Sequence, residues 1–223
     1  MFDLRITRRF ILKAIINIYK WKVGLKMIRI ASQKDAKAIA SLLWEIFEDM
    51  ELSLLKKIPK NTLLEMVAEA VADPVYRYGF KRGIVYELDG EIAGVCFGYK
   101  AVDEPVIDDP FMEVLVNNGY DNNEKLFVDK EALPDEWYLD SIVVNPTYRG
   151  LGIGSALLRE MEQMALKAGS KRIGLNVDIA NPKAKKLYSS IGYTKVAELV
   201  LSGHRYEHLC KALSNTAAAV VQK

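Results

Sequence analysis

The 223-residue sequence contains only two cysteines, Cys96 and Cys210, and only two histidines, His204 and His208. It has no Cys-x-x-Cys pair and no Cys/His cluster along the chain, which argues against a zinc finger or a dithiol redox motif. The two histidines are four residues apart, but their segment is predicted to be a strand and no third ligand is close in sequence. We therefore expect no metal site, and we expect both cysteines to be reduced, buried thiols of a cytoplasmic protein.

No apolar run is long enough to span a bilayer. Residues 1–26 are partly apolar, but Lys13 and Asn17 interrupt them and no small-x-small cleavage site follows. This segment has seven basic residues and one acid, a net +6, whereas the rest has 24 basic and 28 acidic residues, a net −4. We predict that residues 1–26 form a basic appendage outside the fold, with membrane or partner contact as the alternative. The mildly acidic remainder indicates no nucleic-acid surface.

The hydrophobic pattern predicts an α/β (α+β) domain over residues 27–213, followed by a frayed tail, 214–223. Strands are predicted over residues 28–31, 83–88, 91–99, 137–144, 172–177, 193–201 and 203–213. Helical spacing of apolar residues predicts helices over residues 36–47, 61–71, 153–168 and 182–191. The dipeptide Asp89-Gly90 between two strands is typical of a hairpin. Because hairpins pair their strands antiparallel, we expect a mixed, mostly antiparallel central sheet flanked by helices.

Residues 101–136 differ in composition from the rest of the domain. They hold eleven acids against two lysines, a net −9, together with three prolines. We predict an irregular acidic insert here, and irregular segments of this length within compact domains are often functional. Two interpretations stay open, a solvated loop and the wall of a binding cleft.

The most informative motif is the run 149–154, Arg-Gly-Leu-Gly-Ile-Gly, between a predicted apolar strand and a predicted amphipathic helix. Glycines that open a helix leave its first amides exposed and allow close approach, which favours a bound phosphate. A nucleotide-hydrolase phosphate loop needs a lysine and then a serine or threonine after its last glycine, and Ser155-Ala156 follows instead. The dinucleotide fingerprint fails because Ser155 stands at its third glycine and no acid follows about 20 residues on.

Two motifs together resemble a known family. The run 149–154 matches the pattern Arg/Gln-x-x-Gly-x-Gly/Ala, and residues 181–193 (NPKAKKLYSSIGY) match Asn-x-x-Ala-x-x-Leu-Tyr-x-x-x-Gly-Phe/Tyr. Both patterns, about 30 residues apart, are hallmarks of the GNAT superfamily of acyl-CoA N-acyltransferases, which residues 137–195 therefore resemble. The resemblance implies an acyltransferase that moves an acetyl group from acetyl-CoA to a primary amine.

The resemblance also implies which residues bind acetyl-CoA. Amides of the glycine turn would hold the pyrophosphate, with added charge from Arg149. The backbone of Ile142 and Val144 would pair with the pantetheine arm, and an N–H near Val143 would polarise the thioester carbonyl. Asn181 would either contact the cofactor or cap its own helix. The full predicted set is Ile142, Val143, Val144, Arg149, Gly150, Leu151, Gly152, Ile153, Gly154, Ser155 and Asn181.

Direct attack by an amine needs no protein nucleophile but requires two proton transfers. The resemblance assigns Tyr188 as the acid for the leaving thiolate, and a buried structural tyrosine is the alternative. The resemblance favours Asp140 as the base, because family members often carry an acid at this place beside the thioester. An idle carboxylate in an apolar strand is also costly. A hydrogen-bonded structural role for Asp140 stays open, and Glu136 or a bound water could replace it as the base.

The motifs leave the acceptor amine open. If the acidic insert borders the acceptor cleft, its charge would attract a cationic amine, such as a polyamine, an aminoglycoside-like amine or a basic peptide end. The alternative to an enzyme is a non-catalytic acyl-CoA-binding or regulatory module, which keeps the glycine turn and needs no base. The sequence leaves the oligomeric state open.

Overall fold

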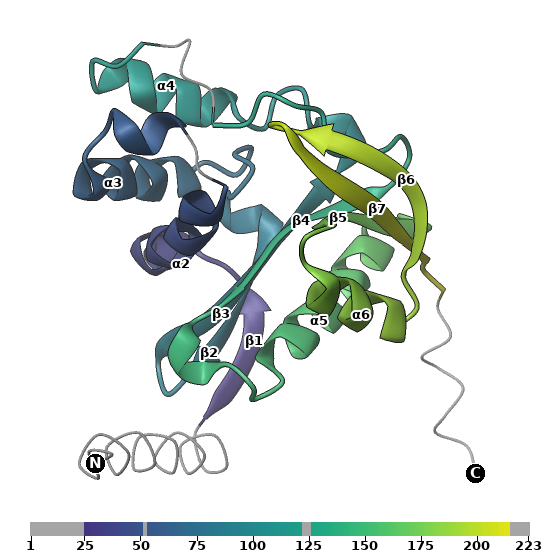
Figure 1. Ribbon diagram of the computed structural model, residues 1–223. Coiled ribbons are helices and arrows are strands. Elements are labelled where there is room, and N and C mark those ends of the chain that lie inside the picture. The colour runs from purple at the N-terminus through teal and green to yellow at the C-terminus, as the bar shows by residue number, and fades with distance from the viewer. Residues whose placement is uncertain (1–24, 51–52, 122–125, 215–223) are drawn as a thin grey trace, which may run out of the picture.

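The computed structural model describes residues 25–50, 53–121 and 126–214, which form a seven-stranded sheet with helices on both faces (Figure 1). The strands are β1 (Lys26–Ile30), β2 (Gly83–Leu88), β3 (Glu91–Lys100), β4 (Trp137–Val144), β5 (Arg172–Asp178), β6 (Thr194–Leu201) and β7 (His204–Ala212). They lie in the order β1-β2-β3-β4-β5-β7-β6. Every neighbouring pair is antiparallel except β4 with β5, so the expected mixed, mostly antiparallel sheet is confirmed.

Two groups of helices cover opposite faces of the sheet (Figure 1). The longer helices are α2 (Ala36–Asp49), α3 (Lys60–Val71), α4 (Asp109–Asn117), α5 (Ile153–Lys167) and α6 (Pro182–Ser190). Helices α2, α3 and α4 share one apolar core with the sheet, centred on buried residues such as Leu43 and Phe97. Helices α5 and α6 pack on the other face, where Leu157 and Met161 are fully buried. Each face therefore has its own core.

The predicted hairpin at Asp89-Gly90 is confirmed and joins β2 to β3. Both residues have positive φ, 53° and 82°, as a two-residue turn of type I′ requires. The aspartate-glycine pair tolerates these values, so the local sequence determines the turn. The long strand β3 then pairs with β2 on one side and β4 on the other, which places β4 at the centre of the sheet.

The prediction that residues 101–136 are irregular is wrong for Asp109–Asn117, which form helix α4. Pro110 stands in the first turn, where its missing N–H removes no helical hydrogen bond. Phe111, Val114 and Leu115 recur at helical spacing and are buried in the core that α2 and α3 also share. The prolines, asparagines and acids around this short apolar stripe masked its helical period in the sequence.

Strands β4 and β5 separate soon after they meet. They pair only at Trp137 with Ile173 and at Tyr138 with Gly174, whereas β3 stays paired with β4 as far as Val144. From Leu139 onward the edge of β4 that faces β5 has no strand partner. A gap therefore opens in the middle of the sheet, beside the turn that leads into α5.

The predicted appendage and tail lie almost entirely outside the described residues, which begin at residue 25 and end at residue 214. Lys26, the last residue of the predicted appendage, is already the first residue of β1. The appendage and the frayed tail therefore stay predictions. Within the described ranges, no helix is both long enough and apolar enough to cross a membrane.

Candidate active site

The glycine turn opens directly onto the N-terminus of α5. Gly150 and Gly152 have φ of 78° and 79°, in the left-handed region, and a Cβ on either would meet nothing within 4 Å. Helix α5 begins at Ile153 with Gly152 as its N-cap. Among the described residues, no hydrogen-bond acceptor is found for the amides of residues 151–155. The turn thus presents unpaired donors at the positive end of a helix dipole, which suits an anion.

Arg149 ties this turn to the rest of the site. Its Nε donates to the carbonyl oxygen of Val144 at 3.1 Å, and its guanidinium forms an ion pair with Glu45 of α2. Both charged side chains are about half exposed, so we expect a small contribution to stability. The contacts join the end of β4, the turn and α2.

The backbone of β4 is oriented toward the gap at alternate residues. Asn145 donates its N–H to the carbonyl of Ala93, on the β3 side. The carbonyl of Val144 points to the other side, where it accepts from Nε of Arg149. Because successive residues of a strand point their N–H groups in opposite directions, the amides of Ile142 and Val144 face the gap. The amide of Val143 itself points to β3. The N–H that was predicted near Val143 to polarise the thioester carbonyl is therefore that of Ile142 or Val144.

Tyr188 belongs to α6, which follows β5, and Asn181 immediately precedes that helix. The side chain of Asn181 accepts the N–H of Ala184 at 3.1 Å and so caps the helix. Tyr188 stacks edge-on against Tyr193, with 5.7 Å between ring centroids. Burial first, and the nearby Cys96 second, raise the pKa of Tyr188 to about 12, so its hydroxyl is protonated at neutral pH. Cys96 is the β3 partner of Ile142, which places Tyr188 on the stretch of sheet beside the gap.

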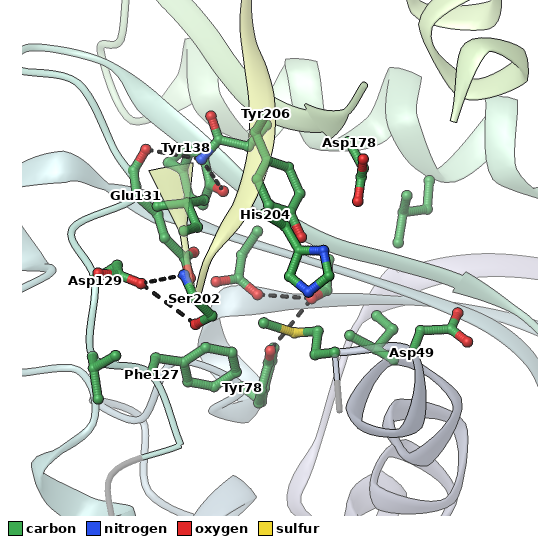
Figure 2. Close-up of a pocket in the computed structure, with 18 residues that line it drawn as sticks. Asp49, Tyr78, Phe127, Asp129, Glu131, Tyr138, Asp178, Ser202, His204 and Tyr206 are labelled. Atoms are coloured by element: carbon green, nitrogen blue, oxygen red, sulfur yellow. Dashed lines mark hydrogen bonds between the residues drawn. The ribbon is translucent and has the colours of Figure 1, made fainter. Parts of the chain in front are cut away.

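A cavity of about 250 Å³ lies at the other end of this gap (Figure 2). Among the described residues, no lysine or arginine lines it, whereas five carboxylates do: Asp49, Asp129, Glu131, Asp140 and Asp178. Ile142 of β4 also lines it, as do His204 and Tyr206 of β7. Figure 2 shows the labelled side chains converging from α2, from residues 127–131 and from the β6–β7 hairpin. The cavity is therefore strongly acidic and reaches the strand predicted to lie beside the thioester.

Arg77 forms the charged centre behind this cavity. Its side chain is 2% exposed and donates to Asp140 at 2.6 Å and to Glu131 at 3.1 Å. Two further bonds of 3.0 Å reach both oxygens of Asp108. Its guanidinium also lies 3.8 Å from the ring centroid of Phe127. One buried cation is thus shared among three carboxylates, a formal excess of two negative charges.

Asp140, the predicted base, uses both of its oxygens within the protein. Oδ1 accepts from Arg77, and Oδ2 accepts from the hydroxyl of Ser141 at 2.7 Å. The side chain is 2% exposed. Burial raises the pKa of Asp140, and Arg77 opposes that shift. The structure places Asp140 in the cavity wall with Ile142, as the strand position suggested, but inside an ion pair.

The chain matches a known family of proteins. Residues 37–193, 157 of the 223, match the family described as Acetyltransferase (GNAT) family. The chain belongs to the GNAT acetyltransferase family. The resemblance of the two sequence motifs is thereby confirmed, and with it the acyltransferase class of enzyme.

Solved structures agree with the assignment of this chain to the GNAT family. One described as an acetyltransferase is 45% identical, with a TM-score of 0.79 over 84% of this chain and all of the other. An N-acetyltransferase from Staphylococcus aureus Mu50 is 31% identical, with a TM-score of 0.72 over 82% of this chain and 99% of the other. Thialysine N-epsilon-acetyltransferase from Bos taurus is 38% identical over 61 residues, which are 27% of this chain and 36% of that relative. The GNAT chain thus matches about a third of that relative's length.

Glu136, the alternative base, lies in a separate buried cluster of this GNAT fold. Its carboxylate is 3.1 Å from Nε2 of His208 and 3.3 Å from Sγ of Cys210. The three ligand atoms lie within 4.8 Å of one another and are of types that can hold a metal ion. The sequence analysis found no third ligand for His208, because Glu136 is distant along the chain. The observed separations are those of hydrogen bonds.

Sequence reasoning missed Arg77 and its ion pair with Glu131. Arg77 lies between two buried tyrosines, Tyr76 and Tyr78, in the segment that joins α3 to β2. No motif marks it, and a single arginine between aromatic residues carries no periodic signal. The sequence indicated Glu131 only as one of the acids of the insert. The net negative charge of the insert indicated the segment that lines the cavity, but no single residue in it.

Proposed function

We propose that this protein transfers the acetyl group of acetyl-CoA to a cationic primary amine, by direct attack of the amine in a ternary complex. The observation that carries the proposal is the position of Ile142. It faces the gap beside β4 and also lines the acidic cavity. A thioester held along the gap would therefore meet an amine held in the cavity.

The donor end fits a CoA pyrophosphate. The unpaired amides of residues 151–155 offer several donors at one helix N-terminus. Gly150 and Gly152 leave the approach open because neither has a Cβ. The gap-facing amides of Ile142 and Val144 can pair with the amide groups of a pantetheine arm, and one of them can polarise the thioester carbonyl. Arg149 steadies this arrangement through the carbonyl of Val144.

The acceptor end fits a positively charged amine. In the part of the chain that the structure describes, five carboxylates and no lysine or arginine line the cavity, and such a surface concentrates cations. Two of these acids, Asp129 and Glu131, belong to the acidic insert, which supports its interpretation as a cleft wall. The relative from Bos taurus carries the name of an amine acetyltransferase, thialysine N-epsilon-acetyltransferase.

The chemistry then needs a base and an acid. The ammonium form of the acceptor must lose a proton before its nitrogen can attack, and a carboxylate of the cavity accepts it. Asp140 is the carboxylate predicted from the sequence. The thiolate that leaves is protonated from the α6 side of the gap, where Tyr188 carries a proton at neutral pH.

A thiol-release assay tests the proposal. Acetyl-CoA is incubated with a panel of cationic amines, neutral amines and basic peptides, and free CoA thiol is measured. We expect turnover with at least one cationic primary amine and lower turnover with neutral amines of similar size. Binding of acetyl-CoA without acetyl transfer to any amine would instead favour the non-catalytic module.

A further inference from the structure

Asp140 and Glu131 both accept from Nη1 of Arg77. They differ in how many of their oxygens accept hydrogen bonds. Asp140 accepts a hydrogen bond on each oxygen, from Arg77 on Oδ1 and from Ser141 on Oδ2. Glu131 bonds Arg77 only through Oε2, at 3.1 Å. Among the described residues, Oε1 of Glu131 has no hydrogen-bond partner. Glu131 therefore keeps one oxygen that accepts no hydrogen bond, whereas both oxygens of Asp140 accept one, which favours the charged form of Asp140 and makes it a weaker base.

Glu131 is also held in place by its own backbone. Its N–H donates to Oε1 of Glu104 at 2.6 Å, and its carbonyl accepts from Nδ2 of Asn176 at 3.1 Å. Its side chain is 12% exposed and lines the cavity that Asp140 and Ile142 also line. A carboxylate at the acceptor end that is held in place and has one oxygen without a hydrogen bond is pre-organised for proton transfer.

We propose that Glu131 is the general base that takes the proton from the acceptor's ammonium group, and that Asp140 is a positioning residue that acts through Arg77 and through its charge. This inference rests on the proposed amine acetyltransfer and names the base for it. Glu131 comes from the acidic insert, which the general family pattern lacks, so the base would be particular to chains that carry such an insert.

The electrostatic surroundings suit this role. Burial raises the pKa of Glu131, Arg77 lowers it, and the charges of Asp140 and Glu104 raise it, so that the pKa of Glu131 is about 7. The tyrosines whose own pKa values respond to Glu131 are Tyr99, Tyr138 and Tyr206. They come from β3, β4 and β7, and all stay protonated at neutral pH because burial raises their pKa values. A base of this kind is about half ionised at neutral pH, where general base catalysis works well.

The proton balance is simple. The ammonium group gives one proton to Oε1 of Glu131, and the neutral nitrogen attacks the thioester carbon. As the N–C bond forms and the C–S bond breaks, the nitrogen loses a second proton and the sulfur gains one, which leaves an amide and the CoA thiol. Glu131 releases its proton to the solvent that fills the cavity. The net reaction releases one proton for each amide formed.

The test is the pH profile of kcat/KM for the best acceptor of the amine panel. We expect the wild-type profile to rise with pH through about 7, because the base must be ionised. Glu131→Gln should lose this rise and lower kcat by about 10²- to 10⁴-fold, the usual contribution of a general base. Asp140→Asn should keep the rise but move it to lower pH, because the charge of Asp140 raises the pKa of Glu131.

Asp49→Asn is the matched control for charge. Asp49 lines the same cavity and is exposed, but it does not contact Arg77. Its substitution removes one negative charge, so we expect a higher KM for the amine with the rise in the pH profile unchanged. A rise that persists in Glu131→Gln and disappears in Asp140→Asn would overturn the proposal and make Asp140 the base.

A second measurement separates a catalytic from a structural role. An acceptor whose amine has a pKa well below the assay pH is already neutral and needs no base for its first proton. The defect of Glu131→Gln should therefore shrink for such an acceptor, whereas a structural defect would be equal for both amines. Equal defects for the two amines would refute the assignment of Glu131. If the wild-type protein acetylates no amine at all, the proposed function fails, which is a distinct outcome.

Discussion

Nη1 of Arg77 lies 2.6 Å from Oδ1 of Asp140, and both side chains are only 2% exposed. Arg77 comes from the segment between α3 and β2, whereas Asp140 stands in the middle of β4. This contact joins a loop beside one helical core to the strand at the gap. Because Arg77 also bonds Asp108 and Glu131, it holds three carboxylates beside the acidic cavity in place.

Removal of this cation should destabilise the fold. Arg77→Met leaves three carboxylates around an apolar side chain, and loss of one partner of a buried ion pair costs about 3–5 kcal/mol. The free energy of unfolding, measured with a denaturant, checks this. Without Arg77 the buried carboxylates favour their protonated forms, so the deficit should grow as pH rises. A variant as stable as the wild type at neutral pH would contradict the central role of Arg77.

The glycine turn should bind acetyl-CoA only while its approach stays open. Gly152→Ala places a Cβ at a residue with φ of 79°, which costs about 1–2 kcal/mol of stability for an L-residue in the left-handed region. The new Cβ also stands where the pyrophosphate would approach. We therefore expect weaker binding of acetyl-CoA, measured by calorimetry.

Gly169→Ala is the matched control for the glycine turn. Gly169 follows the other end of α5, has φ of 83° and also has open space around it. It should lose similar stability and keep the affinity for acetyl-CoA. Equal losses of affinity in both variants would mean that stability, and not the site, limits binding.

Tyr188→Phe should lower kcat while acetyl-CoA still binds. If Tyr188 donates the proton to the thiolate, we expect a loss of about 10²- to 10⁴-fold. Because the pKa of Tyr188 is raised to about 12, its titration should not reduce wild-type activity at pH 9. Tyr193→Phe is the control, since Tyr193 stacks on Tyr188 but donates its hydroxyl to Glu162. Equal kcat in Tyr188→Phe and the wild type would contradict the acid role.

Salt should weaken the binding of a cationic acceptor. From about 0.1 M to about 1 M salt the Debye length falls from about 10 to about 3 Å, which screens the acids of the cavity mouth. We expect KM for a cationic amine to rise several-fold while KM for a neutral amine of similar size stays nearly constant. Parallel changes for the two amines would argue against electrostatic selection by the cavity.

Local patterns predicted much of this fold. Strand β4 was predicted with the bounds Trp137–Val144 that the structure shows, and the Asp89-Gly90 turn has the predicted form. These features depend on neighbouring residues, so a short stretch of sequence contains the necessary information. Helix α4 was missed because only Phe111, Val114 and Leu115 carry its period, and their burial depends on α2 and α3.

The sequence by itself determined the glycine turn, the helix that it opens and the second motif, because these are continuous segments whose chemistry is local. Only the tertiary structure decided the acidic cavity. Arg77 is 54 residues from Glu131 and 63 residues from Asp140 along the chain, and their charges meet because the segment after α3, the acidic insert and β4 pack around one gap in the sheet. Which carboxylate keeps a free oxygen depends on these long-range contacts and on burial, neither of which is encoded at a single position.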